Sequence, residues 1–444
     1  MMKQAVILFT RVPEPGKTKT RMMPHLTPGQ CARLHTCFLM DIAAQCRKSG
    51  ADIFVSFTPE GGRGKLEGIL GPAKGWMAQR GDTLGARMYT AIEEVLGLGY
   101  DACLLIGTDV PELKAEHLEK AFRVLEEKDA VFGRTADGGY YLVGMKRPLK
   151  EAFALDEYGH GKVLEETLRS MGQAGLSVGC TDTLSDMDTC GDLRGYTVRM
   201  CGNRAMRRSF TGRYLAKIRK VSVIVPVYNE SATIGRMQEQ LAPLLGKCEI
   251  LFVDGGSTDD TLAKIDPAFT VIRSAKGRAR QMNEGARQST GDILFFLHCD
   301  SELPDHALAR LKKVMRDHRA GCFGIAFHSK NFFMFTCRVI SNHRVKDRKV
   351  MFGDQGIFLE RDLFFQAGMF PELPVMEDYQ FSLTLKEMGV KLGIADRRIY
   401  TSDRRFPKGT VPKLKLMWKM NRLRKMYRDG VDIQKIADLY RDVR

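Results

Sequence analysis

The sequence Asp292-Ile-Leu-Phe-Phe-Leu-His-Cys-Asp-Ser-Glu-Leu-Pro304 decides how the second half of the chain is interpreted. Its apolar run has the length of a buried strand and is too short to cross a membrane. An acidic residue at the carboxyl end of such a strand, as Asp300 is, lies where open α/β sheets bind ligands. Asp300 is therefore a candidate ligand for a divalent metal held against a diphosphate. The alternative is that Asp300 caps a helix that begins near Pro304.

Short apolar runs followed by polar residues recur along the chain. They are Ala5–Phe9, Asp101–Asp109, Val221–Glu230 and Glu249–Asp254. Stretches with helical periodicity, such as Pro28–Lys48, separate them. This alternation predicts an α/β protein with two tandem nucleotide-binding domains of the Rossmann type and mostly parallel central sheets.

The bulk composition narrows the possible partners. The chain has 444 residues, of which 44% are hydrophobic, and a formal net charge of +16, so it can bury large cores and attract acidic partners such as nucleotides, nucleic acids or anionic lipids. Its 11 cysteines form no CxxC pair, which favours reduced thiols in a cytoplasmic protein. The first apolar run is too short for a signal peptide, so any membrane contact is expected to be peripheral, at the inner face.

A basic stretch marks the expected boundary between the domains. Arg194–Lys220 holds nine Lys or Arg and no Asp or Glu. Such a segment is typical of a solvated linker, or of one that lies on anionic lipid. We therefore expect a first domain over residues 1–204, a linker over 205–219 and a second domain over 220–444.

The first candidate site begins with a basic loop. The first strand runs into Arg11-Val-Pro-Glu-Pro-Gly-Lys-Thr-Lys-Thr-Arg21, in which Lys17, Lys19 and Arg21 cluster. Clustered cations on an irregular backbone suit a di- or triphosphate, although GxxxxGK[ST] is absent. The alternative is a solvated basic loop.

Three aspartates are candidate metal ligands in the first half. Asp109 ends the apolar run that begins at Asp101. Asp186 and Asp188 are two residues apart, so on an extended backbone they share a face and could complete a metal site with Asp109. The alternative is a polar turn.

Three motifs of the first 200 residues resemble one bacterial transferase family. They are Phe9–Arg21, Leu105-Ile-Gly-Thr-Asp-Val-Pro111 and Ala136-Asp-Gly-Gly-Tyr-Tyr-Leu-Val-Gly144. The family is labelled radical-SAM/selenodomain-associated or arsenosugar-type, and it is similar to the nucleotidylyltransferases, with a GT-A-like fold. The resemblance implies that Lys19 and Arg21 grip a nucleoside triphosphate and that Asp109, Asp186 and Asp188 bind metal.

The second half offers a nucleotide pocket at its first two strand ends. Asp254 follows the second strand and can accept hydrogen bonds from a nucleotide. Arg278 and Arg280, in Lys276-Gly-Arg-Ala-Arg280, suit phosphate oxygens. The alternative for these arginines is a capped surface helix.

The motifs of residues 220–442 resemble the family 2 glycosyltransferases. They are Val225-Pro-Val-Tyr-Asn-Glu230, Asp254-Gly-Gly-Ser-Thr-Asp-Asp260, His298-Cys-Asp300, Gly353-Asp-Gln-Gly356 and Met376-Glu-Asp378. The resembled subfamily is the partner in the same arsenosugar group, so the chain looks like a fusion of two related proteins.

This second resemblance implies a role for each matched residue. It places four residues in the base and ribose pocket: Pro226, Tyr228, Glu230 and Asp254. Asp300 matches the metal aspartate of the DxD motif, and His298 replaces the first aspartate, which leaves a competent metal ligand. Asp378 is the expected general base, with Glu377 supporting it, in an inverting mechanism assisted by Mg²⁺ or Mn²⁺. Because the QxxRW motif is absent, transfer of a single sugar is expected.

Three further segments have two interpretations each. Arg404-Arg405 either clasps the diphosphate or is solvated. The aromatic stretch Asn331–Arg338 is either interfacial or an ordinary helix. Lys413–Arg428 is an amphipathic basic helix that either lies on an anionic membrane, which suits a lipid-linked acceptor, or packs on the catalytic domain.

The sequence thus predicts a metal-dependent glycosyltransferase that uses a nucleotide-sugar donor and a small-molecule or lipid-linked acceptor. Its first domain makes or holds that donor. One alternative is two glycosyltransferase domains in tandem. The other is a non-catalytic nucleic-acid-binding protein, which the clustering of acids at strand ends and the lack of an RNA-binding motif disfavour.

Overall fold

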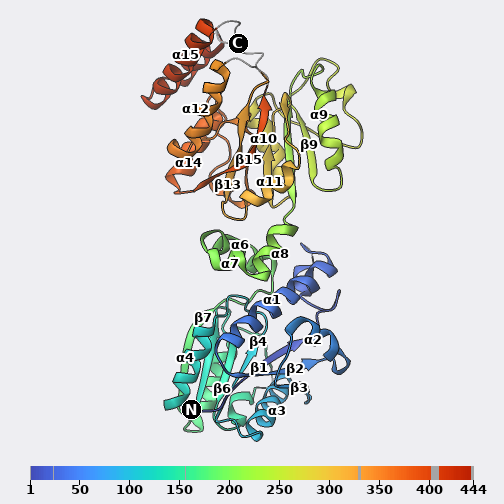
Figure 1. Cartoon of the computed structure of the whole chain (residues 1–444), viewed down its shortest axis with the longest axis vertical. Coiled ribbons are helices and arrows are strands. Elements are labelled where there is room, and N and C mark those ends of the chain that lie inside the picture. The colour runs from blue at the N-terminus through green and yellow to red at the C-terminus, as the bar shows by residue number, and fades with distance from the viewer. Residues whose placement is uncertain (1, 24, 156, 329–331, 402–409, 442–444) are drawn as a thin grey trace. The chain divides into compact units, whose positions relative to one another are not determined.

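A computed structural model describes residues 1–444 except 1, 24, 156, 329–331, 402–409 and 442–444. The chain divides into two compact units, Met1–Leu215 and Ala216–Arg444 (Figure 1). Each is described by itself.

The first unit is built on a seven-stranded sheet of order β3-β2-β1-β4-β6-β5-β7. Four of its neighbouring strand pairs are parallel, and β6 is antiparallel to both β4 and β5. The strands are β1 (Gln4–Arg11), β2 (Asp52–Thr58), β3 (Gly75–Ala78), β4 (Ala102–Gly107), β5 (Ala130–Thr135), β6 (Tyr140–Met145) and β7 (Val178–Leu184). The helices are α1 (Pro28–Lys48), α2 (Arg63–Leu70), α3 (Leu84–Gly97), α4 (Ala115–Glu127), α5 (Val163–Gln173), α6 (Cys190–Gly202) and α7 (Arg204–Arg208), and α8 (Phe210–Ile218) crosses the boundary between the units.

Both faces of this sheet are covered, as expected for a mostly parallel sheet. Val6 and Leu8 of β1 pack in one apolar cluster with α1, α2 and α4. Ala5 and Ile7 point to the opposite face and pack with α3 and α5. The uninterrupted apolar run of β1 is therefore buried on both sides, at about 2 kcal/mol for each large side chain removed from water.

The second unit is built on an eight-stranded sheet of order β10-β9-β8-β11-β14-β13-β15-β12. The pairs from β10 to β11 and the pair β13–β15 are parallel, and the other three are antiparallel. The strands are β8 (Val221–Val227), β9 (Glu249–Asp254), β10 (Thr270–Arg273), β11 (Ile293–Phe296), β12 (Ser301–Glu302), β13 (Ala320–Ala326), β14 (Ile357–Glu360) and β15 (Leu392–Thr401). The helices are α9 (Ile234–Leu241), α10 (Arg278–Gln288), α11 (Ala307–Val314), α12 (Phe332–Arg348), α13 (Arg361–Gln366), α14 (Glu377–Glu387), α15 (Thr410–Arg428) and α16 (Ile433–Arg441).

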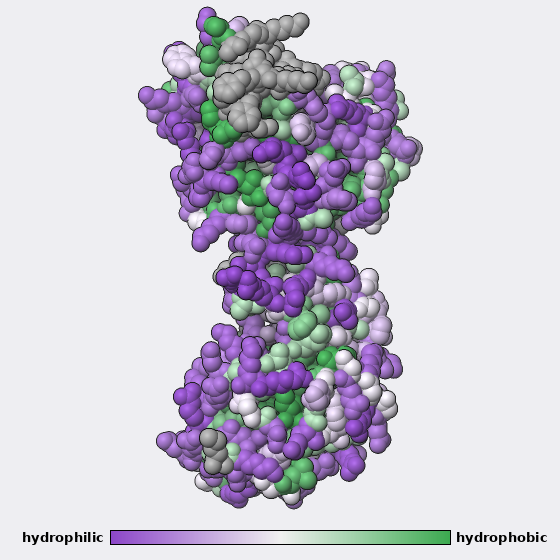
Figure 2. All heavy atoms as spheres, in the orientation of Figure 1, coloured by the Kyte–Doolittle hydropathy of each residue, from purple (hydrophilic) through white to green (hydrophobic). Residues whose placement is uncertain are grey.

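Both central sheets are thus mixed and mostly parallel, and the predicted α/β class with two GT-A-like units is confirmed. In the second unit α9 and α11 cover one face, and α10, α13 and α14 cover the other. Around the sheets, most atoms on the face drawn in Figure 2 are hydrophilic, in line with a chain in which 27% of residues are charged.

The stretch expected as a basic linker, residues 205–219, is helical. Two backbone N–H groups at the start of α8 donate to the carboxylate of Asp41 on α1, from Phe210 at 2.8 Å and from Thr211 at 2.9 Å. Thr211 and Leu215 are buried. Arg207 and Arg208 lie on α7, and Arg213 lies on α8, whose start these two hydrogen bonds fix. The count of charges in the sequence did not reveal the apolar face of α8.

Candidate functional site

The carboxyl ends of β8, β9 and β11 meet at one edge of the second sheet, because these strands are parallel neighbours. Asp254 ends β9 and is 2% exposed. Its carboxylate accepts hydrogen bonds from the backbone N–H of Gly256 at 2.9 Å and of Ser257 at 3.1 Å. These bonds shape the loop after β9 and leave further lone pairs for a ligand.

The loop after β8 carries the other predicted pocket residues. Pro226 lies within β8, and Tyr228 follows it. The ammonium of Lys276 lies 4.1 Å from the centre of the Tyr228 ring, a cation–π contact. The carboxylate of Glu230 accepts a hydrogen bond from the Thr233 hydroxyl. Lys276 was not predicted as a site residue, although it directly precedes the motif that holds Arg278 and Arg280.

Arg280 lines a pocket of about 330 Å³ beside the end of β10. The pocket is lined by Arg273, Ser274, Ala275, Arg280, Glu284, Arg287 and Glu372. Arg280 forms an ion pair with Glu372 at 2.8 Å. The backbone N–H of Ser274 donates to the carbonyl of Asp254 at 2.8 Å, so this basic pocket adjoins the predicted nucleotide edge.

Asp300 and His298 follow β11 at the same edge of the sheet. Asp300 does not cap the next helix, because α11 begins at Ala307 with His306 at its N-cap position. The ring of His298 lies against Gly353, where an added Cβ would come within 2.7 Å of its Nε2. The same Cβ would lie 3.4 Å from Oδ2 of Asp378. Gly353 therefore permits the close approach of His298 and Asp378.

Glu377 and Asp378 form the first turn of α14, after Met376 in a left-handed conformation (φ 67°). Asp378 is fixed by the backbone: its Oδ2 accepts from the N–H of Gly353 at 2.7 Å. Glu377 is 6% exposed and lies 3.4 Å from the guanidinium of Arg278. The two adjacent carboxylates thus have different partners.

The electrostatics of this site centre on Arg278. Burial alone would lower the pKa of Arg278, but Glu377, Asp378 and, more weakly, Asp300 outweigh it and hold the pKa above its ordinary value. Burial raises the pKa of Glu377, and the neighbouring Asp378 raises it further, against the effect of Arg278. The predicted catalytic pair, the predicted metal aspartate and a predicted phosphate-binding arginine therefore share one electrostatic environment.

The carboxyl-terminal helices pack on this site. Leu423 of α15 and Ile436 of α16 are buried in one cluster with Val350, Met376 and Tyr379. Figure 1 shows α15 drawn beside α12 and α14. Of the two interpretations of the segment Lys413–Arg428, packing on the catalytic unit is therefore confirmed for its carboxyl-terminal half.

Several residues of these helices reach the site and were missed in the sequence. The guanidinium of Arg428 donates to the hydroxyl of Tyr379 at 3.0 Å, and the hydroxyl of Tyr427 donates to Gln380 at 2.8 Å. Tyr440 of α16 contributes to the surroundings of Arg278. No local motif marks such contacts, because each joins residues about 50 or more positions apart. Arg404 and Arg405 lie outside the described residues, as do the side chains of Asn331–Arg338.

In the first unit the structure brings Lys19 onto two of the predicted metal ligands. The Lys19 ammonium lies 2.5 Å from Oδ1 of Asp109 and 2.5 Å from Oδ1 of Asp188. Its side chain is 5% exposed. Burial alone would lower the pKa of Lys19, but Asp109 and Asp188 outweigh it and hold the pKa above its ordinary value. His35 lies 3.7 Å from Asp109, and burial lowers the pKa of His35 to about 4.

The segment Asp186–Asp192, which follows β7, contains a helix cap. Thr189 begins α6, and its side chain accepts from the N–H of Asp192, whose carboxylate accepts in turn from Thr189. This is the capping-box arrangement. Asp186 is half-buried, and burial, with Asp137 and Asp188 nearby, raises its pKa to about 6.

The remaining basic-loop residues lie in the open. Lys17 pairs with Glu14 at 3.0 Å and its side chain is 77% exposed, and Arg21 is exposed. Both are accessible to a phosphate but are not held toward one. Of the three predicted cations, Lys19 alone joins the aspartate cluster.

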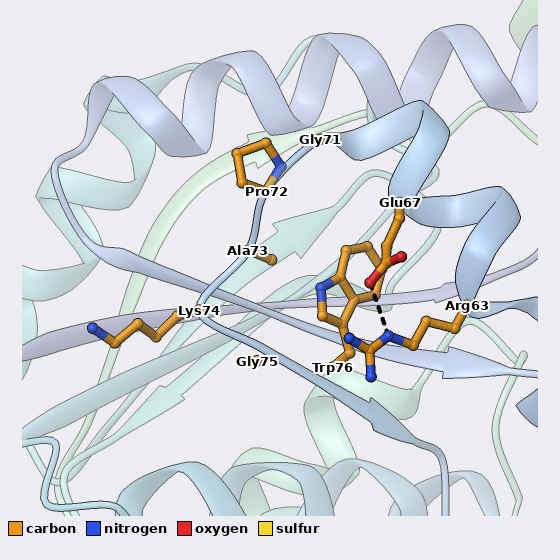
Figure 3. A pocket seen from close by; sticks show the side chains of 8 residues that line it. All are labelled: Arg63, Glu67, Gly71, Pro72, Ala73, Lys74, Gly75 and Trp76. Carbon is orange, nitrogen blue, oxygen red and sulfur yellow. Dashed lines mark hydrogen bonds and ion pairs between the residues drawn. The ribbon is translucent and has the colours of Figure 1, made fainter.

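A further pocket of about 500 Å³ lies at the edge strand β3 (Figure 3). It is lined by Arg63, Glu67, Gly71, Pro72, Ala73, Lys74, Gly75 and Trp76. Arg63 and Glu67 form an ion pair of 2.8 Å across one turn of α2 beside the Trp76 ring. Because β2 and β1 separate β3 from β4 in the sheet, this pocket does not belong to the Asp109 cluster.

The two units differ in how well they suit a divalent metal. Among the residues that the structure describes, no group of three or more His, Cys, Asp or Glu side chains could hold one. In the second unit Asp300 and His298 supply donors that Mg²⁺ and Mn²⁺ accept, and such ions complete their shell with substrate phosphates and water, so these residues fit. In the first unit the Lys19 ammonium already occupies the space between Oδ1 of Asp109 and Oδ1 of Asp188, so that set does not fit a metal in this conformation.

No helix among the described residues has the length and apolar character needed to cross a bilayer.

Comparison with known proteins assigns a family to a part of each unit. Residues 41–160 match the family described as "Uncharacterized protein conserved in bacteria (DUF2064)". Residues 222–370 match "Glycosyl transferase family 2".

Two curated relatives are similar to short stretches of the chain. Glucosyl-3-phosphoglycerate synthase of Mycolicibacterium smegmatis is 33% identical over 99 residues, which cover 20% of this chain and 33% of that protein. Undecaprenyl-phosphate 4-deoxy-4-formamido-L-arabinose transferase of Serratia proteamaculans is 32% identical over 113 residues, which cover 22% of this chain and 35% of that protein. The matches thus span about a third of the length of these relatives.

One solved structure is similar to about half of the chain. It comes from Desulfovibrio desulfuricans and is described as a nucleotide-diphospho-sugar transferase, with 32% identity, a TM-score of 0.46, and coverage of 49% of this chain and 95% of that one. The chain is thus similar to the DUF2064 family within its first unit and to glycosyltransferase family 2 within its second unit.

Proposed function

We propose that the second unit transfers one sugar from a nucleotide-diphosphate donor to an acceptor hydroxyl. The observation that carries this proposal is the position of Asp378, which the Gly353 N–H fixes beside His298, at the sheet edge that also holds Asp254 and Asp300. A family 2 domain with a fixed carboxylate at the strand ends has the parts that glycosyl transfer requires.

Each side chain has a distinct part in this proposal. Asp378 takes the proton from the acceptor hydroxyl, whose oxygen bonds to the anomeric carbon of the sugar. The bond from that carbon to the diphosphate breaks, the nucleoside diphosphate leaves, and the transferred sugar has the inverted configuration. Arg278 holds Glu377 and lies within reach of the diphosphate. Asp254, with Pro226, Tyr228 and Glu230, binds the base and ribose. The pocket beside Arg280 extends this nucleotide edge.

Asp300 and His298 would hold Mg²⁺ or Mn²⁺. The ion, when bound, supplies positive charge to the departing diphosphate. The protein itself supplies the fixed base, the buried guanidinium and the pocket for the nucleotide.

The first unit is proposed to make or hold the activated sugar. Lys17 and Arg21 are exposed and accessible to phosphates. The resemblance of this unit to the arsenosugar-type transferase family, which is similar to the nucleotidylyltransferases, supports this role. Joining the two units in one chain raises the effective concentration of the activated sugar at the second unit, which uses it.

A surface on α15 supports peripheral contact with an anionic membrane. Val411, Leu414 and Trp418 are 62%, 51% and 69% exposed. Lys415 directly follows Leu414, and Lys419 directly follows Trp418. Apolar and basic side chains together favour a membrane interface, where a lipid-linked acceptor would be found. The two relatives bear names that contain a phosphate-bearing molecule, undecaprenyl phosphate or 3-phosphoglycerate.

The test is release of nucleoside diphosphate from a panel of UDP-, GDP-, ADP-, CDP- and dTDP-sugars with Mg²⁺ or Mn²⁺. We expect release from one donor by the full chain and its loss in Asp300→Ala. Release that persists unchanged in Asp300→Ala would contradict the assignment of the metal ligand.

A further inference from the structure

Arginines from two helices gather beside the proposed base, around an aromatic ring. The guanidinium carbons of Arg344 on α12 and Arg424 on α15 lie 5.6 and 5.4 Å from the centre of the Phe352 ring. Phe352 stacks on Tyr379, with ring centres 6.2 Å apart. Arg428 donates to the hydroxyl of Tyr379 at 3.0 Å.

This arginine cluster, Arg344, Arg424 and Arg428, is tied to the catalytic carboxylate through the chain itself. Phe352 directly precedes Gly353, whose N–H holds Asp378. Tyr379 directly follows Asp378. The two rings beside the arginines are therefore the sequence neighbours of the proposed base, Asp378, and of Gly353, which holds it.

The cluster carries more positive than negative charge. Arg424 is half-buried and, among the described residues, forms no ion pair within 4.0 Å. Its guanidinium donates to the amide oxygen of Asn421 at 2.7 Å. Burial first, and then the like charges of Arg344 and Arg348, lower the pKa of Arg424 to about 10, while Tyr379 and Asp378 act against this. Bringing like charges together beneath a protein surface costs free energy, which an anion would repay.

The arrangement suits an oxyanion. A guanidinium stacked on an aromatic ring keeps its N–H donors in the ring-parallel plane, where two of them match the oxygens of a phosphate. Asp378 is near both Arg424 and Arg278. Arg278 belongs to the surroundings of Asp300, where the donor diphosphate is proposed, whereas Arg424 comes from the carboxyl-terminal helices.

We propose that Arg344, Arg424 and Arg428 form an anion-binding subsite that holds a phosphate group of the acceptor next to Asp378. The subsite rests on the proposed function for its description as an acceptor site. Its chemistry is shared by a soluble phosphate monoester and by a phosphorylated lipid.

The test is footprinting of the full chain with phenylglyoxal, which modifies arginine, followed by mass spectrometry of the peptides. The probe is inorganic phosphate, compared with chloride at equal ionic strength. At a phosphate concentration about ten times the dissociation constant, modification of Arg424 should slow about tenfold. Arg422, exposed on the same helix, is the internal control and should react at the same rate in both salts.

Equal changes at Arg424 and Arg422 would overturn the subsite. A variant gives the second arm: Arg424→Lys should retain phosphate-dependent protection of Arg428, and Arg424→Gln should lose it, whereas a merely structural arginine would leave that protection unchanged in both. Glycerol 3-phosphate and vesicles of phosphatidic acid in phosphatidylcholine then distinguish a soluble from a lipid source, since protection by one of them identifies it.

The footprint does not depend on turnover. Protection of Arg424 without release from any donor would leave the anion subsite standing and count against sugar transfer. Release of nucleoside diphosphate from a donor without protection of Arg424 would support sugar transfer and count against the anion subsite.

Discussion

Both units place aspartates at the carboxyl edge of a sheet and bring a buried cation to them, but the cations are used differently. In the first unit the Lys19 ammonium pairs with both Asp109 and Asp188. In the second, Arg278 pairs with Glu377, and Asp378 is held by an uncharged backbone N–H. The same strand-end pattern thus yields an ion cluster in one unit. In the other it yields the proposed base, a carboxylate that, among the described residues, has no cation between it and a neighbouring aspartate.

Replacing the base should have the largest effect on activity. Asp378→Asn keeps the shape of the side chain but removes the proton acceptor, so turnover should fall about 10²- to 10⁴-fold. Glu377→Gln is the matched variant next to it and should cost less, because Glu377 is expected to act through Arg278 and Asp378. The measurement is the rate of nucleoside diphosphate release, with thermal unfolding as a check on folding; equal losses in both variants would contradict the division of roles.

Removing Arg278 should change the pH dependence of the second unit. Burial, and then Asp378, already raise the pKa of Glu377, and Arg278 opposes them. In Arg278→Gln the carboxylate pair should keep a proton to higher pH, so the acidic limb of log kcat/KM should move up by about 1 pH unit. A limb that stays in place, or moves to lower pH, would show that Arg278 does not stabilise the ionised pair.

Lys19→Met tests the closed cluster of the first unit. It leaves Asp109 and Asp188 close together without their cation, which should lower the free energy of unfolding by about 2 kcal/mol, less than a fully buried pair because both carboxylates are partly exposed. Mn²⁺ should then restore part of that stability, while it leaves the native chain unchanged. Lys17→Met, at an exposed position, is the control and should change stability by less than about 0.5 kcal/mol.

The smallest expected effect concerns Asp186. The pKa of Asp186 in the folded state, about 6, lies above its ordinary value. The folded state therefore binds a proton at Asp186 more readily than the unfolded state does. The contribution of Asp186 to the free energy of unfolding thus declines as pH rises from about 4 to 6. Asp186→Asn should therefore flatten the pH dependence of the unfolding midpoint in this window and raise it slightly at pH 7. Identical pH profiles for the variant and the native chain would show that Asp186 does not contribute to the pH dependence of stability.

Much of the fold was predictable because it is encoded locally. Helix α1 was predicted over Pro28–Lys48 from its helical periodicity, and the structure shows these bounds. The structure adds a capping box between Thr27 and Gln30 at its start. The strands β4, β9 and β11 were visible as short apolar runs before Asp109, Asp254 and Asp300; β9 ends at its aspartate, and β4 and β11 end two and four residues before theirs. The alternation of such runs with helices fixed the class.

The site was predictable only in part. The motifs placed Asp378 and Arg278 in the same region, but Arg424 and Arg428 come from a helix whose contacts depend on the tertiary fold. Lys19 was predicted to bind phosphate because it lies in a basic loop. In the structure its backbone is left-handed (φ 53°), and its side chain contacts Asp109 and Asp188 instead. A count of charges along the sequence cannot show whether a lysine will contact a phosphate of the substrate or a carboxylate of the protein.

The central claim is that the two units carry separate chemistries, with sugar transfer at Asp378. The most direct measurement compares two activities in the native chain, Asp378→Asn and Asp109→Asn. One is pyrophosphate release from nucleoside triphosphate and sugar 1-phosphate, and the other is nucleoside diphosphate release from a nucleotide sugar. We predict that Asp378→Asn loses only diphosphate release and that Asp109→Asn loses only pyrophosphate release. Diphosphate release that survives in Asp378→Asn and disappears in Asp109→Asn would contradict the account and move sugar transfer to the first unit.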